Sequence, residues 1–169
     1  EARGQSIFAN TIKGSIAGGR FEGSALFDWT QGWAVSGKLT LSDVKGEELL
    51  DGISPRTRLT GRLSANLDFS MASFNLDQLL DSLQLKGVFS AKDGVLENLD
   101  FVSPARRNAS ASGVQGGSTK YNTLSGAISK EGPRLSLSNI KLVSGNLVVS
   151  ANLSANNGKL AGNARVSLG

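Results

Sequence analysis

Along most of this 169-residue chain, apolar residues alternate with small or polar ones. The clearest run lies between Leu59 and Phe69, where Leu63, Ala65 and Leu67 are separated by polar side chains. Because successive side chains of a β-strand point to opposite faces, a period of two indicates a strand with one buried and one solvated face. The pattern recurs before and after this run, so it predicts a mainly β chain.

Turn residues separate the alternating runs and predict how the strands connect. We expect a hairpin turn at Asp93-Gly94, because both residues tolerate the positive φ of a type I′ turn, and further turns at Glu131-Gly132-Pro133 and Asn156-Asn157-Gly158. The alternation slips near Asn139, which indicates a bulge or a strand end. The predicted fold is an antiparallel meander forming a twisted, curved sheet, a groove or half-pipe, with one or two short helices.

Apolar residues of the first third also keep a regular spacing. We interpret Phe8, Ile12 and Ile16 as one face of a first strand, and the run from Phe21 to Trp29 as a second strand. We expect Trp29 and Trp33 to be packing anchors or sheet-edge residues. Gly recurs at the start of strands, as at Gly61, Gly87 and Gly126, which predicts strong twist, bulges or close backbone contact.

Two segments depart from the β pattern. The leucine spacing after Asn75 predicts a helix of about two turns over Asn75–Leu83, with Asn75 and Gln78 in a capping-box arrangement. Residues 45–50 predict a second, shorter helical turn, and the small-residue composition of residues 103–119 predicts a mobile loop. We expect residues 1–169 to form a single β-rich module, a fragment cut from a larger protein.

Missing side-chain types limit the chemistry that this chain can perform. It contains no Cys and no His, so disulfides, thiolate or imidazole metal sites, Cys nucleophiles and His-based acid–base catalysis are excluded. Capping and solvated surfaces account for the carboxylates that share a predicted element, such as Asp77 and Asp81. We therefore expect a protein that is not an enzyme and that has no catalytic residue, cofactor or metal.

Charge and hydropathy limit the classes of partner that we expect for this chain. The net charge is +4, but the cations are dispersed, and the group Arg56, Arg58 and Arg62 has no aromatic run beside it on which bases could stack. We expect no nucleic-acid partner. No run of 18 or more apolar residues suited to a membrane-spanning helix occurs in the sequence.

The order of segments from residue 59 onward resembles the C-terminal region of AsmA-like proteins of the Gram-negative envelope. The resemblance is carried by Gly61–Phe69, the predicted helix Asn75–Leu83, Gly87–Leu96 and Tyr121–Ile128, and it covers roughly residues 59–168. It implies a periplasmic body with an inner-membrane anchor and a long twisted sheet curved into an apolar groove. It also implies a role in outer-membrane biogenesis and homeostasis through phospholipid transport, with other envelope proteins as further partners.

Nine apolar residues of the alternating runs are the candidate site. They either fill a closed core or line a lipid path, because a strand that alternates Leu, Val and Ala on one face supplies a strip of apolar surface in both cases. The other function that fits the pattern is a structural β-repeat of a secreted adhesin or autotransporter-type protein that binds no lipid. The candidates are Leu63, Leu67, Phe69, Phe89, Leu135, Leu137, Leu147, Val149 and Leu153.

Overall fold

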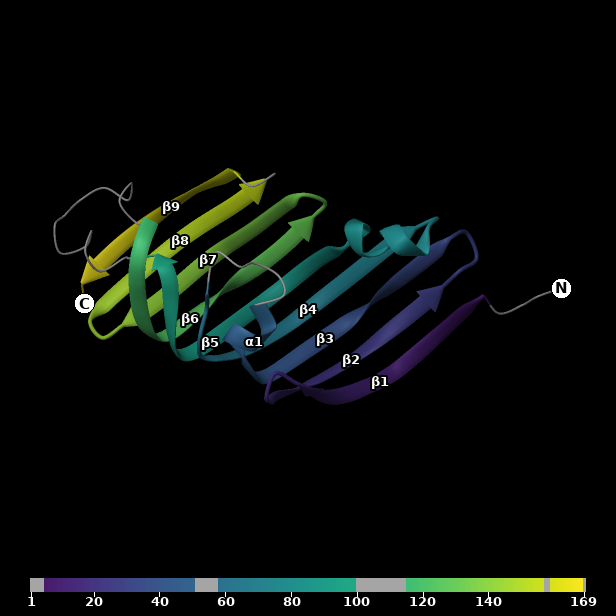
Figure 1. Ribbon diagram of the computed structural model, residues 1–169, viewed down its shortest axis with the longest axis horizontal. Helices are drawn as coiled ribbons and strands as arrows, with labels where there is room; N and C mark the ends of the chain where they lie inside the picture. Colours follow the sequence, from purple (N-terminus) through teal and green to yellow (C-terminus); the bar gives the residue numbers. More distant parts are fainter. Residues whose placement is uncertain (1–4, 51–57, 100–114, 157–158, 169) are drawn as a thin grey trace.

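A computed structural model describes residues 5–50, 58–99, 115–156 and 159–168. Its nine strands form one antiparallel sheet in which the order of the strands follows the chain, so each strand pairs with its sequence neighbours (Figure 1). The sheet is curved and does not close. The strands are β1 (Ser6–Ile16), β2 (Gly19–Asp28), β3 (Trp33–Lys45), β4 (Arg62–Ser73), β5 (Gln84–Leu99), β6 (Gln115–Glu131), β7 (Arg134–Ser144), β8 (Leu147–Asn156) and β9 (Lys159–Leu168).

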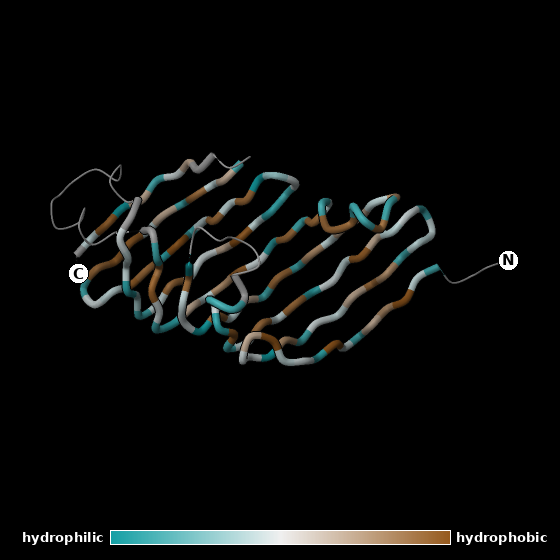
Figure 2. The backbone as a smooth tube through the Cα atoms, in the orientation of Figure 1, coloured by the Kyte–Doolittle hydropathy of each residue, from teal (hydrophilic) through white to brown (hydrophobic). Residues whose placement is uncertain are grey.

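The predicted meander is thus confirmed, and its period-two pattern places mostly apolar side chains on one face and mostly polar ones on the other. Directly paired residues of antiparallel strands share a face. Leu67 pairs with Leu39 on β3 and with Gly87 on β5, whereas its neighbour Asp68 pairs with Lys38 and Lys86. Colouring by hydropathy shows the same alternation along the strands (Figure 2). We call the side of the sheet that carries Leu67 the apolar face and the other side the polar face.

Short helices lie at both places where the sequence predicts them, but the one after Asn75 is 3-10 and not α-helical. The predicted two-turn helix is instead a pair of 3-10 turns, η1 (Leu76–Gln78) and η2 (Leu80–Ser82), between β4 and β5. Asn75 is extended and makes no side-chain capping bond to the backbone; its Nδ2 lies 3.4 Å from Gln78 Oε1. The shorter helix is present as α1 (Gly46–Leu50).

Two turns and one bulge follow the prediction. β6 ends at Glu131 and β7 begins at Arg134, with Gly132 between them at φ 54°. The pairing of β7 with β8 shifts between Leu137 and Ile140, where Asn139 has φ 52°. β8 ends at Asn156 and β9 begins at Lys159, so the chain reverses there as expected, although residues 157 and 158 lie outside the described part.

The prediction of a hairpin turn at Asp93-Gly94 is wrong, because both residues lie within β5. Asp93 does adopt a positive φ of 51°, but the strand continues past it and stays paired with β6 through Glu97. A positive φ in the middle of a strand twists and bends it. The ends of β5 and β6 accordingly curl over in Figure 1.

Two further expectations are corrected. A register shift between Ala9 and Ile12 puts Phe8 on the polar face, paired with Leu26, whereas Ile12 and Ile16 face the apolar side. The alternation alone did not reveal this bulge. Of the loop predicted over residues 103–119, residues 115–119 belong to β6, and residues 103–114 lie outside the described part of the chain.

Glycines on the apolar face lie under aromatic rings of the next strand. A Cβ at Gly14 would meet the Phe21 ring, one at Gly37 would lie 3.0 Å from the Phe69 ring, and one at Gly126 would lie 3.2 Å from the Phe89 ring. The missing side chains leave room for these rings, and glycines at such positions support curvature in twisted sheets. The close backbone contact predicted from the recurrent glycines is therefore present.

A candidate apolar groove

The apolar face consists of rows of paired residues that run across the sheet, perpendicular to the strands. Two rows lie toward the edge that carries η1 and η2, and we call them the open rows. The first contains Ala25, Gly37, Phe69, Leu85, Lys130, Leu135 and Ala155. The second contains Gly23, Leu39, Leu67, Gly87, Ile128, Leu137 and Leu153.

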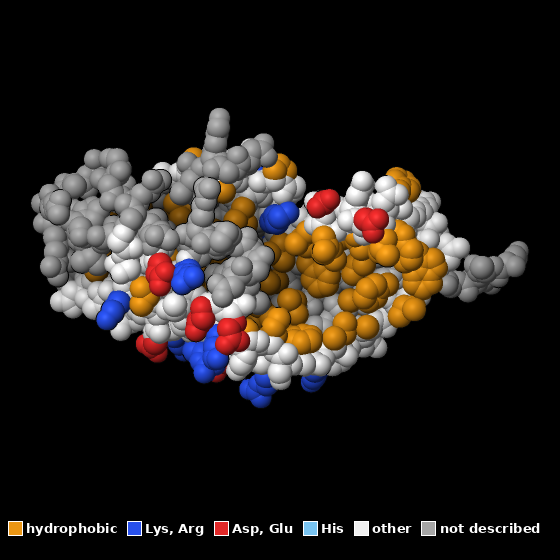
Figure 3. Space-filling view, viewed as in Figure 1, with side chains coloured by type: hydrophobic (Ala, Val, Ile, Leu, Met, Phe, Trp, Pro, Cys, Tyr) orange, Lys and Arg blue, Asp and Glu red, His pale blue; other side chains and the backbone are white. Residues whose placement is uncertain are grey.

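From β4 to β8, every side chain of the open rows is at least partly exposed to solvent. Ala25, the open-row residue on β2, is 4% exposed. Beyond the first open row, toward the same edge, the apolar face of β1–β3 is more exposed: Ile7 is 59% exposed, Phe27 on β2 is 41% exposed and Trp33 on β3 is 43% exposed. In Figure 3 this part of the face forms a hollowed, largely hydrophobic surface over β1–β5. Large exposed apolar patches on a folded protein commonly mark binding surfaces.

Farther from η1 and η2, toward the C-terminal strands, the same face is closed. Leu142 and Val149 are each 1% exposed, and they belong to a hydrophobic cluster that also contains Leu59 and Tyr121. Tyr121 lies beyond the bend of β5 and β6, so the curled ends of these two strands cover the face of β7 and β8. We call this cluster the closed core; it consists of Leu59, Leu63, Ala91, Tyr121, Leu124, Leu142, Leu147 and Val149.

All nine candidate residues lie on the apolar face, but the structure divides them into two groups. Leu63, Leu147 and Val149 are buried in the closed core. Phe89 is partly buried and packs against the closed core and against the smaller cluster of Leu41, Val44 and Ala65. The remaining candidates belong to the open rows: Leu67, Phe69, Leu135, Leu137 and Leu153.

Sequence reasoning overlooked the one charged residue of the two open rows. Lys130 pairs with Leu85 on β5 and with Leu135 on β7, so it lies among apolar side chains. The signal was present in the sequence, because Lys130 is two residues after Ile128 and therefore has the same parity.

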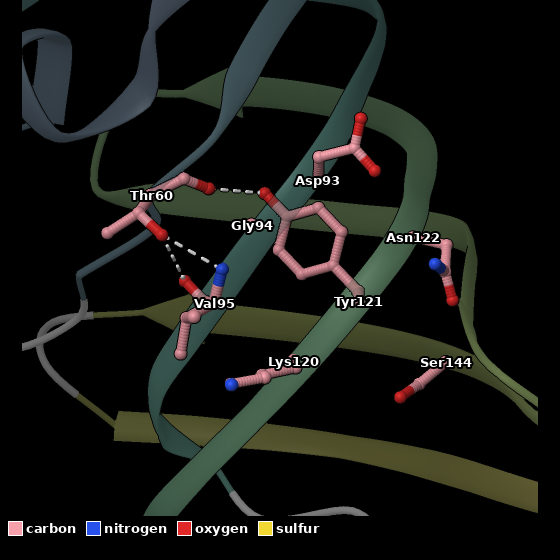
Figure 4. A pocket seen from close by; sticks show the side chains of 8 residues that line it. All are labelled: Thr60, Asp93, Gly94, Val95, Lys120, Tyr121, Asn122 and Ser144. Carbon is pink, nitrogen blue, oxygen red and sulfur yellow. Dashed lines mark hydrogen bonds between the residues drawn. The ribbon is translucent and has the colours of Figure 1, made fainter.

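A half-open pocket of about 320 Å³ lies where β5 and β6 bend (Figure 4). The Tyr121 hydroxyl donates to the Thr60 carbonyl at 2.5 Å, and the Val95 amide donates to Thr60 Oγ1 at 2.9 Å. Burial raises the pKa of Tyr121 to about 12, and the carboxylates of Glu47 and Asp93 add to the shift. These bonds fasten the segment before β4 onto the bend.

The pocket does not assemble a reactive group. Figure 4 shows the side chains of Asp93 and Lys120 on opposite sides of the Tyr121 ring, directed away from each other. Over the described ranges, no cluster of three or more carboxylates is placed to hold a metal ion. Asp77 and Asp81, which share the 3-10 segment, are both exposed. We therefore regard the pocket as a consequence of the bend, and the apolar face as the candidate site.

No model of a known protein family matches the chain, and searches of curated proteins and of solved structures also found no match. The described residues include no helix that is long and apolar enough to span a membrane. The site must therefore be interpreted from its own geometry.

Proposed function

We propose that the apolar face binds the acyl chains of lipids along its open rows and over β1–β3. The observation that carries the proposal is the continuity of the two rows, which cross β2–β8 on one face while the opposite face carries Ser, Lys and Asn. A lipid tail can lie across the strands without meeting a charged group between Ala25 and Leu85.

Burial of apolar surface is enough to make such binding favourable. Each methylene group that leaves water contributes about 0.8 kcal/mol. An acyl chain that covers half-exposed residues such as Phe69, Leu67 and Phe27 shields its own surface and theirs together. The headgroup stays in water at the rim of the sheet.

The closed core has a different role in this proposal. Leu63, Leu147 and Val149 are already packed against other side chains, so they stabilise the curved sheet and do not contact lipid. The lipid path is thus narrower than the nine candidates suggested.

In the cell, we propose that this module lies in the periplasm as part of an inner-membrane-anchored envelope protein that moves phospholipid for outer-membrane biogenesis and homeostasis. This part of the proposal rests on the sequence pattern that resembles AsmA-like proteins. The curved, unclosed sheet with one apolar face is compatible with it.

Site-specific photo-crosslinking tests the lipid path directly. A benzophenone amino acid replaces Phe69 in an open row, Val149 in the closed core, or Asp68 on the polar face, and the protein is irradiated with phospholipid vesicles. We expect lipid adducts, detected by mass spectrometry, at position 69 and none at 149 or 68. Capture at 68 as efficient as at 69, or none at 69, would contradict the proposal and favour a structural β-module without lipid.

A further inference from the structure

Lys130 is the one charged residue in the two open rows. Its row neighbours are Leu85 and Leu135, and Phe69 follows on β4. Lysine normally lies with its stem along apolar surface and its ammonium group at the water boundary. Lys130 satisfies this description from a site within the proposed lipid path.

Two hydrogen bonds fix the ammonium group at the rim. Lys130 Nζ donates to the Leu83 carbonyl at 3.2 Å and to the Gly132 carbonyl at 3.0 Å. Leu83 follows η2, and Gly132 lies in the β6–β7 turn, so the charge is held where the apolar face meets solvent. An ammonium group has three N–H donors, which leaves one for a further acceptor.

The described residues supply no carboxylate partner for this ammonium. The ion pairs within these ranges join Lys13 to Glu22 at 3.1 Å and Lys45 to Glu48 at 2.6 Å. Within the described part of the chain, Lys130 thus presents a positive charge without an ion-pair partner beside an apolar surface. The complementary ligand carries a negative charge at the end of an apolar chain.

The row that contains Lys130 is long enough to hold such a ligand, and it continues past Gly37 to Ala25 on β2. Lys130 on β6 and Gly37 on β3 belong to the same row, three strand spacings apart. At about 4.8 Å per spacing the separation along the sheet is roughly 14 Å. One acyl chain spans half of a hydrocarbon core of about 30 Å, or roughly 15 Å.

We propose that Lys130 binds the anionic headgroup of an amphiphile whose acyl chain lies across the open rows from β6 toward β3. This inference rests on the proposed function, because it assigns the ligand of the same face. The shared chemistry is a carboxylate or phosphate on an alkyl chain, which a fatty acid or an anionic phospholipid would provide.

The test uses ligands with the same twelve-carbon chain and different heads: dodecyl phosphate, dodecanoate and neutral dodecyl maltoside, each below its micelle concentration. Binding is followed by the fluorescence of Trp29 and Trp33. The variants are Lys130→Gln, which removes the charge, Lys130→Arg, which keeps it, and Lys86→Gln, which removes an exposed lysine from the polar face of β5.

We expect Lys130→Gln to weaken binding of an anionic ligand roughly tenfold, since it removes a charge-assisted hydrogen bond. Dodecyl maltoside should bind all variants alike, and Lys130→Arg and Lys86→Gln should resemble the wild type. A loss confined to dodecyl phosphate supports a phospholipid as the source, a loss confined to dodecanoate supports a fatty acid, and a loss with both supports anion binding in general.

Two results would overturn the role of Lys130. In the first, Lys130→Gln binds the anions as tightly as the wild type does. In the second, Lys130→Gln loses binding of the anionic and neutral ligands equally, which would mean that the lysine only fastens the two carbonyls. In both cases wild-type binding of dodecyl maltoside still supports the apolar path. If neither class of ligand binds the wild type, the proposed function fails together with the inference.

Discussion

Single residues decide how closely the strands of this sheet can approach. Gly87 in the second open row is an example, because a Cβ there would collide with the carbonyl oxygen of Asn66 and lie 2.9 Å from the Leu67 Cα. The obstacle is backbone, which cannot rotate away as a side chain can. The strand pairing between β4 and β5 therefore requires glycine at this position.

Gly87→Ala should lower the free energy of unfolding by about 1–3 kcal/mol, because the new methyl group forces the paired strands apart. Urea denaturation measures the change. Ser90→Ala on the exposed polar face of β5 is the matched control and should stay within about 0.5 kcal/mol of the wild type. Equal effects of the two substitutions would argue against the close contact at Gly87.

Tyr121 gives the protein a predictable response to alkaline pH. Its pKa is raised from 10.0 to about 12, mainly by burial, so the folded state keeps the phenolic proton more tightly than the unfolded state does. The resulting stabilisation is fully present below about pH 10 and is lost as the pH rises toward 12, with an upper limit on the order of 2–3 kcal/mol.

The measurement is the free energy of unfolding of the wild type and of Tyr121→Phe between pH 9 and pH 12. Phe cannot ionise, so the difference in stability between the two proteins should shrink over this range. Contributions from the rest of the chain are common to both proteins and cancel in the comparison. A difference that stays constant with pH would show that the hydroxyl is not held in its neutral form.

At the scale of elements, the 3-10 turns at the rim contain one buried apolar side chain, and Ser82 Oγ also accepts a hydrogen bond from the Ala72 amide on β4 at 2.9 Å. Leu79, between η1 and η2, is 9% exposed, whereas Leu80 is 73% exposed. Leu79→Ala should therefore destabilise the protein by about 1–3 kcal/mol in thermal denaturation, and Leu80→Ala by less than about 0.5 kcal/mol. The reverse order would mean that the segment packs through its other side.

The strands were predictable because alternation is a local property. Leu63, Leu67 and Phe69 occur at every second or fourth position, and the face they share follows from this spacing. Turns whose glycine has a positive φ, such as Gly132, were predictable for the same reason. Pairing between strands is not local. The turn signal at Asp93 therefore did not end the strand: β5 remains paired with β6 on both sides of Asp93, and the positive φ produces a bend.

The sequence could not show which candidate residues lie in the closed core and which lie in the open rows, because this too depends on contacts between distant strands. Val149 and Leu137 have the same alternation and a similar apolar character, yet one is buried in the closed core and the other lies in an open row. What separates them is the curl of β5 and β6, which brings Tyr121 over β8. That curl depends on the bend at Asp93, which no periodicity predicts.

For the whole molecule, the closed core and the open rows predict an uneven stability. Amides of β5–β8 should exchange slowest with deuterium, because these strands enclose the closed core. Amides of β1 should exchange fastest, since this strand is at the edge, is interrupted by a bulge and has exposed apolar residues such as Ile7. Hydrogen exchange followed by mass spectrometry resolves this gradient, and uniform protection would contradict it.

Because each strand pairs with its sequence neighbours, the width of the sheet is proportional to the number of strands. Inserting one more hairpin into a meander adds two strands, or roughly 9.6 Å of sheet width at about 4.8 Å each, without rearranging the pairs already formed. The span of an apolar track built in this way is then set by the number of hairpins that a gene encodes.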